Sequence, residues 1–205
     1  SVDHMIAVAD HAEKAVMCEN VTDDVRENII LAALLHDADD RKIFGSSENY
    51  AHARKILFEA GALENKVDSI IEMISLVACS SNKDTADPNI AQWKFIPRDC
   101  DRLEAIGYVG IQRCNEYSSF TGVPDFLPET PKVYTEDELW QVSTPQRFAQ
   151  HKKSVSKIDH YYDKLLHIGK PECLKSQNSY ILQTAAQRYN IMIAYVLNFW
   201  KHQAH

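Results

Sequence analysis

The sequence predicts an all-α protein. Apolar residues recur every three or four positions through most of the chain, as they do on the buried face of an amphipathic helix. No stretch alternates between apolar and polar residues for more than a few positions, as a half-buried strand would. A chain of 205 residues can form one well-packed core, so we expect a single helical domain over residues 1–205.

The first half of the sequence contains most of the regular periodicity. We expect helices at 3–19, about 23–35, 49–60 and 64–78, and a fifth helix around Asp101. Thr22 or Asp23 can cap the second helix, because short polar side chains accept hydrogen bonds from the first backbone N–H groups of a helix. Apolar residues become almost continuous before His36, which predicts that this end of the second helix is buried.

The second half is interrupted by a segment of irregular composition. Residues 117–143 include one glycine and three prolines among mixed polar residues, which favours a loop over a packed helix. Thr144 followed by Pro145 is a typical helix start, and we expect a long helix from there to Ile168. A last helix should run from about 174 to 200. The expected architecture is one helical domain with a loop, and a candidate lid, inserted at about 117–143.

Composition excludes several classes of protein. A net charge of −7 argues against nonspecific nucleic-acid binding, which usually requires a basic surplus. No apolar run reaches the roughly 18 to 20 residues of a membrane-spanning helix, and no secretory signal is visible, so we expect a cytoplasmic protein. The five cysteines are scattered and never form a Cys-x-x-Cys pair, which disfavours a disulfide framework and a structural zinc site.

The dipeptide His36-Asp37 is the first indication of chemistry, because it follows the apolar run Leu-Ala-Ala-Leu-Leu directly. A buried charge costs several kcal/mol unless it is paired or bound to a metal. Imidazole and carboxylate together suit a divalent ion such as Mn, Co, Ni, Fe, Zn or Mg. His4 and Asp101 are the best additional donors, because both begin or interrupt apolar helical patterns. The spacing alone favours a simpler interpretation, in which the dipeptide is a buried ion pair or a helix cap.

A resemblance to a known family changes that balance. The chain resembles the HD-domain superfamily, whose motif is a His, then His-Asp at the end of a helix, then a distant Asp. Residues 99–113, Asp-Cys-Asp-Arg-Leu-Glu-Ala-Ile-Gly-Tyr-Val-Gly-Ile-Gln-Arg, are similar to the run Asp-Ala-Asp-Arg-Leu-Asp-Ala-Ile-Gly-Ala-Ile-Gly-Ile-Ala-Arg of a bacterial and fungal subgroup. Residues 160–166, His-Tyr-Tyr-Asp-Lys-Leu-Leu, are similar to that subgroup's His-Phe-Tyr-Glu-Lys-Leu-Leu. Together the matches extend from the first residues to about position 168.

The resemblance implies an activity and a metal. It implies an HD-type helical domain in which His4, His36, Asp37 and Asp101 hold one divalent ion. The subgroup resembles enzymes that hydrolyse nucleotides, so we expect (deoxy)nucleoside triphosphates to be cleaved with release of pyrophosphate. Three alternatives stay open: a 5′-nucleotidase acting on monophosphates, a noncatalytic nucleotide-binding HD domain, and a metal oxygenase, which would need further histidines. A homodimer is also left open.

The acidic residues after the His-Asp pair are candidates for proton transfer. Related enzymes place a water-activating carboxylate at the position of Asp40, often as Glu, so we expect Asp40 to be the general base. Asp39 could share this role. The alternative is an acidic turn that only caps the next segment.

A phosphate substrate needs positive counter-charge. We expect Lys42, Arg102 and Lys164 to contact the phosphates, with Arg113 a weaker candidate. The ordinary interpretation of such residues is a solvated surface. His52 does not match the ligand spacing of two-metal HD proteins, and His160 either supports the site or is simply packed.

Overall fold

A computed structural model describes residues 2–40, 48–77, 89–150 and 153–203. The described residues form helices and turns and contain no strand, which confirms the all-α prediction. None of the helices in this part of the chain has the length and apolar character needed to cross a membrane. Packing divides the chain into two compact units, which are described separately. The first comprises residues 1–101 and 175–181, and the second comprises residues 102–174 and 182–205.

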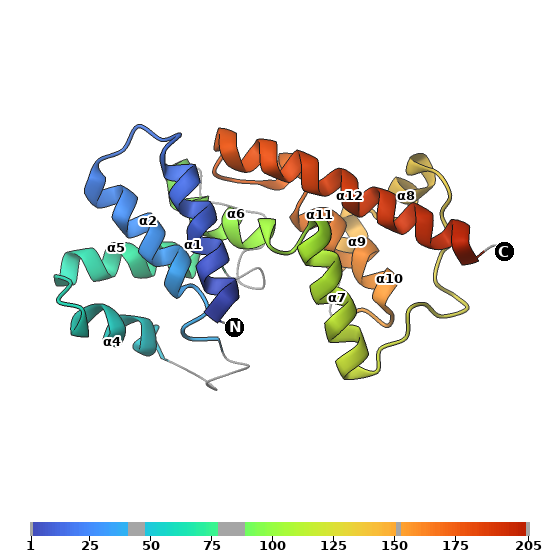
Figure 1. Cartoon of the computed structure of the whole chain (residues 1–205), viewed down its shortest axis with the longest axis horizontal. Helices are drawn as coiled ribbons and strands as arrows, with labels where there is room; N and C mark the ends of the chain where they lie inside the picture. Colours follow the sequence, from blue (N-terminus) through green and yellow to red (C-terminus); the bar gives the residue numbers. More distant parts are fainter. Residues whose placement is uncertain (1, 41–47, 78–88, 151–152, 204–205) are drawn as a thin grey trace. The chain divides into compact units, whose positions relative to one another are not determined.

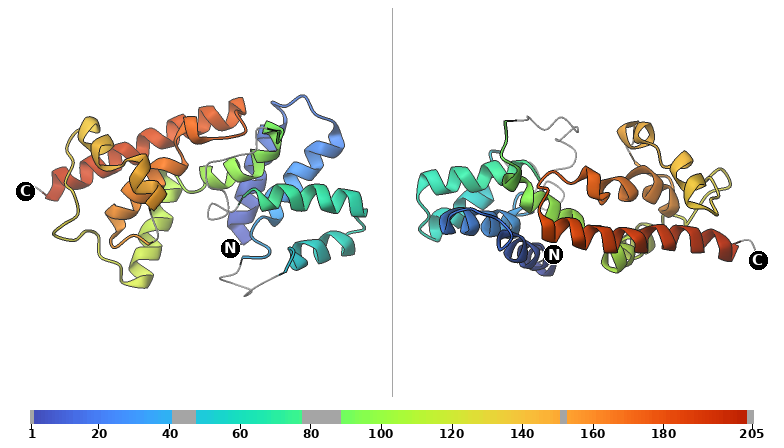
Figure 2. Two further views of the ribbon diagram at one scale, coloured as in Figure 1. Left: turned by 180° about the vertical axis from the view of Figure 1, so that it is seen from behind. Right: turned by 90° about the horizontal axis from the view of Figure 1, so that it is seen from above.

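The first unit is built on the four N-terminal helices. Its elements are α1 (Val2–Val16), α2 (Asp23–Leu35), α4 (Ala51–Glu59), α5 (Glu64–Ser75) and most of α6 (Ile96–Leu103), which follows the short 3-10 turn η1 (Gln92–Phe95). Helix α2 packs against both α1 and α5, and α4 lies beside α5 (Figures 1 and 2). The observed bounds differ from the predicted ones by three residues or fewer at each described end.

Helix α2 shows why this part of the fold follows the sequence closely. The Thr22 hydroxyl accepts a hydrogen bond from the Val25 backbone N–H at 3.4 Å, as predicted for the cap. Asp23 and Asp24 follow in the first turn, where negative charge interacts favourably with the helix dipole. Ile29 and the alanines on the same face are fully buried, so the last turn of α2 presents His36 to the interior.

Residues 175–181 join the first unit through Asn178, which caps α12 (Ser179–Gln203). Its Oδ1 accepts hydrogen bonds from the backbone N–H groups of Tyr180 and Ile181, and its Nδ2 donates to the Ala15 carbonyl at 2.9 Å. The Ser176 backbone N–H donates to the buried Asp99 carboxylate at 2.7 Å. The first residues of α12 are thereby tied to α1 and α6.

The second unit differs most from the sequence prediction. Its elements are α7 (Gly107–Thr121), α8 (Glu136–Val142), α9 (Pro145–Gln150), α10 (Lys157–His160), the π-helical turn η2 (Tyr161–Leu165), α11 (Leu166–Ile168), the 3-10 turn η3 (Pro171–Cys173) and most of α12. The single long helix expected from 144 to 168 is wrong. Ser156 caps a new helix by accepting the Asp159 backbone N–H, and the π turn follows directly.

The irregular segment is also shorter than predicted. Helix α7 continues to Thr121 and ends at Gly122, which adopts the left-handed conformation (φ 68°) that glycine accepts most easily. Helix α8 begins at Glu136 with a capping box between Thr135 and Glu138. The expected loop of about 117–143 is therefore limited to residues 122–135.

Two glycines of the 99–113 segment lie at positions in the second unit that have no room for a side chain. Gly107 has a φ of 71°, and a Cβ there would lie 2.9 Å from the Arg188 side chain. A Cβ at Gly110 would lie 2.3 Å from the Ala105 carbonyl oxygen. The Arg188 guanidinium donates to the Leu103 carbonyl at 2.6 Å, so the turn after α6 is tightly packed against α12. Any side chain at these two positions would force the turn apart.

Candidate metal centre

The first unit brings together the four side chains that the sequence singled out as metal ligands. His4 lies in the first turn of α1, His36 and Asp37 follow α2 directly, and Asp101 lies on α6. The His4 Nε2 atom is 3.1 Å from Asp101 Oδ1 and 3.8 Å from Asp37 Oδ2. The His36 Nε2 atom is 3.4 Å from Asp37 Oδ2 and 3.6 Å from Asp101 Oδ1. We call these four residues the His–Asp cluster.

The orientation of His36 determines which ring nitrogen faces the carboxylates. Its Nδ1 lies 2.7 Å from the Ala33 carbonyl oxygen, which can only accept, so Nδ1 carries the proton. The opposite nitrogen, Nε2, is then an acceptor directed at the carboxylates. This atom is buried and has no hydrogen-bond partner among the described residues. A buried acceptor without a partner is costly, and a bound cation would satisfy it.

The separations within the His–Asp cluster fit a single ion. Donor atoms held at about 2.1 Å from one metal are roughly 3.0 Å apart in an octahedron and roughly 3.4 Å apart in a tetrahedron. The four nitrogen-to-oxygen distances lie between 3.1 and 3.8 Å, and the donor atoms of His4, His36 and Asp37 lie within 4.8 Å of one another. The nitrogen-to-oxygen separations are therefore close to those expected of donor atoms that share one ion.

The electrostatics of the His–Asp cluster favour the ionised form of Asp101. Burial raises the pKa of Asp101, but the imidazoles of His36 and His4 outweigh it and hold that pKa well below its ordinary value. Burial lowers the pKa of His36, but Asp101, Asp37 and the Ala33 carbonyl more than offset it, so this pKa is raised. Burial and the neighbouring charges of Asp99 and Asp101 raise the pKa of Cys100, which keeps its thiol neutral and unsuited to metal binding.

Asp39 has a contact that the sequence analysis did not foresee. Its carboxylate is buried, and it accepts hydrogen bonds from the backbone N–H groups of His52 at 3.0 Å and Ala53 at 2.9 Å, at the start of α4. The His52 ring also contacts Asp39, with Nδ1 3.0 Å from Oδ1. Asp39 therefore caps α4, the capping role that the sequence left as the alternative for the acidic turn, and it contacts His52, which ligand spacing had set aside.

The other candidate residues differ in how the structure places them. Asp40 is half-buried in the turn after the cluster, where its backbone N–H donates to the Asp37 carbonyl at 3.1 Å. Lys42 lies outside the described residues. Arg102 belongs to the second unit, where its guanidinium donates to the Cys173 carbonyl at 3.1 Å. Lys164 lies half-buried in the π turn η2, so both substrate assignments in the second unit stay predictions.

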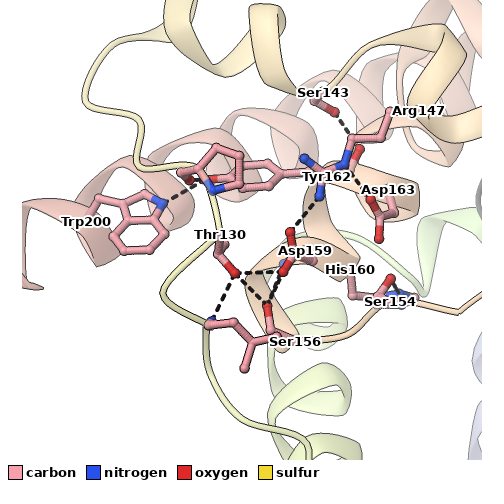
Figure 3. A network of polar contacts seen from close by, with 12 residues as sticks. Thr130, Ser143, Arg147, Ser154, Ser156, Asp159, His160, Tyr162, Asp163 and Trp200 are labelled. Atoms are coloured by element: carbon pink, nitrogen blue, oxygen red, sulfur yellow. Dashed lines mark hydrogen bonds and ion pairs between the residues drawn. The ribbon is translucent and has the colours of Figure 1, made fainter.

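The second unit contains a buried polar cluster of its own (Figure 3), which we call the Asp159 network. The Asp159 carboxylate accepts hydrogen bonds from the hydroxyls of Thr130 and Ser156, each at 2.7 Å, and from the Arg147 guanidinium at 2.6 Å. Arg147 also pairs with Asp163. Both oxygens of the buried carboxylate are thereby engaged by protein donors.

The Asp159 network anchors the irregular segment 122–135. Besides the bond from Thr130, the Tyr162 hydroxyl donates to the Pro131 carbonyl at 2.9 Å and accepts from Trp200 Nε1 at 2.7 Å (Figure 3). The backbone N–H of Lys157 donates to the Pro124 carbonyl at 2.9 Å. Phe126 packs against Trp200 with the ring centroids 5.2 Å apart. These contacts favour a segment that is fixed to the rest of the second unit over the movable lid that the composition suggested.

Comparison with solved structures defines the class of fold. No family model matches the sequence. A Lactobacillus plantarum protein of known structure shares 22% identity, with 98% of this chain and 86% of that chain covered and a TM-score of 0.69. An HD-superfamily hydrolase of Bacillus thuringiensis shares 21% identity over 98% and 85% of the two chains, with a TM-score of 0.67. Bacillus subtilis YpgQ shares 22% over 97% and 86%, with a TM-score of 0.62. The chain shares the fold of these three proteins, one of which is an HD-superfamily hydrolase.

A much closer relative defines the family. An uncharacterized protein of Acanthamoeba polyphaga mimivirus is 46% identical over 213 residues, which cover 97% of this chain and 87% of the viral protein. The chain belongs to the same family as that viral protein.

Proposed function

We propose that this protein is a metal-dependent phosphohydrolase that acts on nucleotides. The observation that carries the proposal is the His–Asp cluster, in which a buried imidazole acceptor and two carboxylates converge without an internal partner for His36 Nε2. The HD-superfamily fold supports a hydrolase. One solved structure of Bacillus subtilis YpgQ, 21% identical to this chain, is a complex with ADP, which supports a nucleotide as the substrate class.

The proposed chemistry divides the work between the ion and the protein. One divalent ion held by His4, His36, Asp37 and Asp101 would polarise a phosphoryl oxygen and make a water molecule more acidic. Asp40 accepts the proton of the attacking water, because it lies in the same turn as Asp37 and the carboxylate of Asp39 is committed to α4. The new phosphorus–oxygen bond forms as the bond to the leaving oxygen breaks.

We propose (deoxy)nucleoside triphosphates as the substrates, with attack at the α-phosphorus and release of pyrophosphate. The second candidate is a 5′-nucleotidase, which would use the same cluster on a monophosphate. The identity of the ion belongs to the same proposal, because nitrogen and oxygen donors together suit Mn, Co, Ni, Fe and Zn as well as Mg. Lys42, Arg102 and Lys164 are proposed to meet the phosphates.

A screen of stripped and reloaded protein tests the function. Purified protein would be freed of metal, reloaded with individual divalent ions and incubated with nucleoside mono- and triphosphates, and phosphate and pyrophosphate would be separated. We expect metal-dependent release of pyrophosphate from a triphosphate, and no release by the matched variant Asp37→Ala. Release of phosphate from monophosphates alone would select the nucleotidase. The proposal fails if no nucleotide is hydrolysed with any ion.

A further inference from the structure

His52 and Asp39 form an oriented imidazole–carboxylate pair next to the His–Asp cluster. An ionised carboxylate can only accept hydrogen bonds, so the contact at 3.0 Å places a proton on His52 Nδ1 and fixes the plane of the ring. The Asp39 side chain is 6% exposed whereas the His52 side chain is 48% exposed. Asp39 is thus the buried member of the pair. The Nε2 edge of the His52 ring lies on the side opposite to Asp39.

The position of the pair follows from the chain itself. Asp39 lies two residues after Asp37, so their Cα atoms are at most about 7.6 Å apart. His52 is the second residue of α4, whose first backbone N–H groups point at the same carboxylate. The ring therefore contacts a residue of the same turn that contains Asp37, which we propose to bind the ion.

The backbone conformation just before α4 indicates that contacts hold the start of this helix, and with it His52, in position. Asn49 and Tyr50 both have positive φ angles, 54° and 56°, which bring the chain sharply into α4. This conformation is costly for a residue with a bulky side chain, and it persists only where surrounding contacts impose it. Three hydrogen bonds to Asp39 hold the start of α4 in this position.

We propose that His52 is a phosphate-binding residue of the enzyme and that Asp39 is its positioning residue. With phosphate bound, the ring donates from Nδ1 to Asp39 and from Nε2 to a phosphate oxygen of the substrate. The Asp39 carboxylate also accepts from the first backbone N–H groups of α4, so it holds the turn after Asp37 against that helix. The inference rests on the proposed function, because it assigns a phosphate to the site.

Two substitutions of His52 separate binding from structure. His52→Asn places an amide N–H near the position of Nδ1, so it keeps the bond to Asp39 and removes the distal donor. His52→Gln places its amide N–H near the position of Nε2, so it keeps the distal donor and disturbs the bond to Asp39. A purely structural histidine would tolerate Asn better than Gln, whereas a phosphate-binding histidine would tolerate Gln better than Asn. His202→Asn, at an exposed position on α12, is the matched control.

The experiment measures binding of inorganic phosphate to metal-loaded protein by calorimetry, with metal content and melting temperature recorded for each variant. Loss of one charge-assisted hydrogen bond should weaken phosphate binding by His52→Asn roughly 10- to 100-fold, with metal content unchanged. His52→Gln, which keeps a neutral donor in place of a charged one, should lose clearly less affinity than His52→Asn, and His202→Asn should be unchanged. In the wild type, adding phosphate should also shift the His52 Nε2 resonance in spectra of ¹⁵N-histidine-labelled protein, and Asp39→Asn should weaken that shift.

Two results would overturn this assignment. In the first, His52→Asn binds phosphate as tightly as the wild type and His52→Gln binds it more weakly. That ranking is expected of a histidine with a purely structural role. The other is a wild-type protein in which phosphate leaves the His52 resonance unmoved. Because the readout is binding rather than turnover, a protein that binds phosphate through His52 and hydrolyses no nucleotide would refute the proposed function and leave this inference standing.

Discussion

The His–Asp cluster of the first unit and the Asp159 network of the second unit are both groups of polar side chains, but they differ in exposure and in how their atoms are satisfied. The Asp37 and Asp101 side chains are 36% and 34% exposed, whereas that of Asp159 is 6% exposed. In the Asp159 network each carboxylate oxygen receives a hydrogen bond from a hydroxyl or a guanidinium. In the His–Asp cluster, His36 Nε2 is buried beside carboxylates that are not aligned to bond with it. Protein donors satisfy the Asp159 carboxylate, whereas His36 Nε2 in the His–Asp cluster is left for the cation that we propose.

The comparison distinguishes residues that we expect to stabilise the fold from residues that we expect to bind a ligand. A buried polar network whose members all find partners fixes a unique packing, and its loss destabilises the fold. A buried cluster of acceptors gives up stability in the absence of a ligand and regains it on binding. Substitutions in the His–Asp cluster should therefore mainly lower activity, and substitutions in the Asp159 network should mainly lower the free energy of unfolding.

The largest effect is expected from Asp37→Ala. The change removes a carboxylate from the His–Asp cluster, so metal content should fall to background and hydrolysis should fall at least about 1000-fold, which corresponds to roughly 4 kcal/mol of transition-state stabilisation. Metal analysis and turnover measure the two losses, with circular dichroism as the control for folding. A variant that keeps its metal and its activity would remove Asp37 from the site.

Asp159→Ala should have the opposite signature. It leaves Arg147 without one carboxylate partner and removes the acceptor of two buried hydroxyls, so unfolding in urea should show a loss of roughly 3 kcal/mol. The folded variant should still bind one equivalent of metal. If this variant lost metal binding while keeping its stability, the assignment of a structural role to the Asp159 network would be wrong.

Metal should stabilise the protein through the first unit. At a free metal concentration 100 times the Kd, one site that exists only in the folded state adds about 2.7 kcal/mol to the free energy of unfolding. Thermal or urea unfolding with and without the ion measures this gain. The same titration on Asp37→Ala should give no gain, and an equal gain in that variant would place the stabilising ion elsewhere.

Metal affinity should fall as the pH is lowered. The raised pKa of His36 means that a proton competes for Nε2 already at pH values above 6.5, and one competing proton costs up to tenfold in affinity per pH unit, or about 1.4 kcal/mol. Asp101 contributes nothing in this range, because its lowered pKa keeps it ionised.

The metal-free protein should show the opposite trend. A histidine with a raised folded-state pKa adds stability that is fully present below the unfolded value of 6.5 and is lost as the pH rises through the folded value. Calorimetric titration at several pH values measures the affinity, and urea unfolding of the metal-free protein measures the stability. A metal affinity that is flat between pH 5.5 and 8 would contradict the assignment of His36 as a ligand.

The smallest effect is expected from Trp200→Phe. The change removes the hydrogen bond from the indole N–H to the Tyr162 hydroxyl, whose other bond to the Pro131 carbonyl is kept, so the loss of stability should be about 1 kcal/mol. Metal binding should be unaffected. A change in metal affinity with no change in stability would contradict the separation of the two polar clusters.

The extent to which the sequence predicts this structure depends on the range of the interactions. Helix α2 is predictable because its cap, its acidic first turn and its apolar face all lie between Thr22 and Leu35. The convergence of His36 and Asp101 is predictable only through the resemblance to HD proteins, since their separation along the chain carries no geometric information. The break of the 144–168 segment depends on contacts between Asp159 and Thr130, 29 positions away, and periodicity does not register such contacts. The same reason hides the pairing of Asp39 with His52.

A crystal structure of protein loaded with Mn²⁺, with the anomalous scattering of the ion measured, tests the central claim most directly. The account predicts one anomalous peak per chain within about 2.0 to 2.3 Å of the Nε2 atoms of His4 and His36 and of a carboxylate oxygen from each of Asp37 and Asp101. A peak at another place, or no peak in protein that hydrolyses nucleotides with Mn²⁺ added, would contradict it.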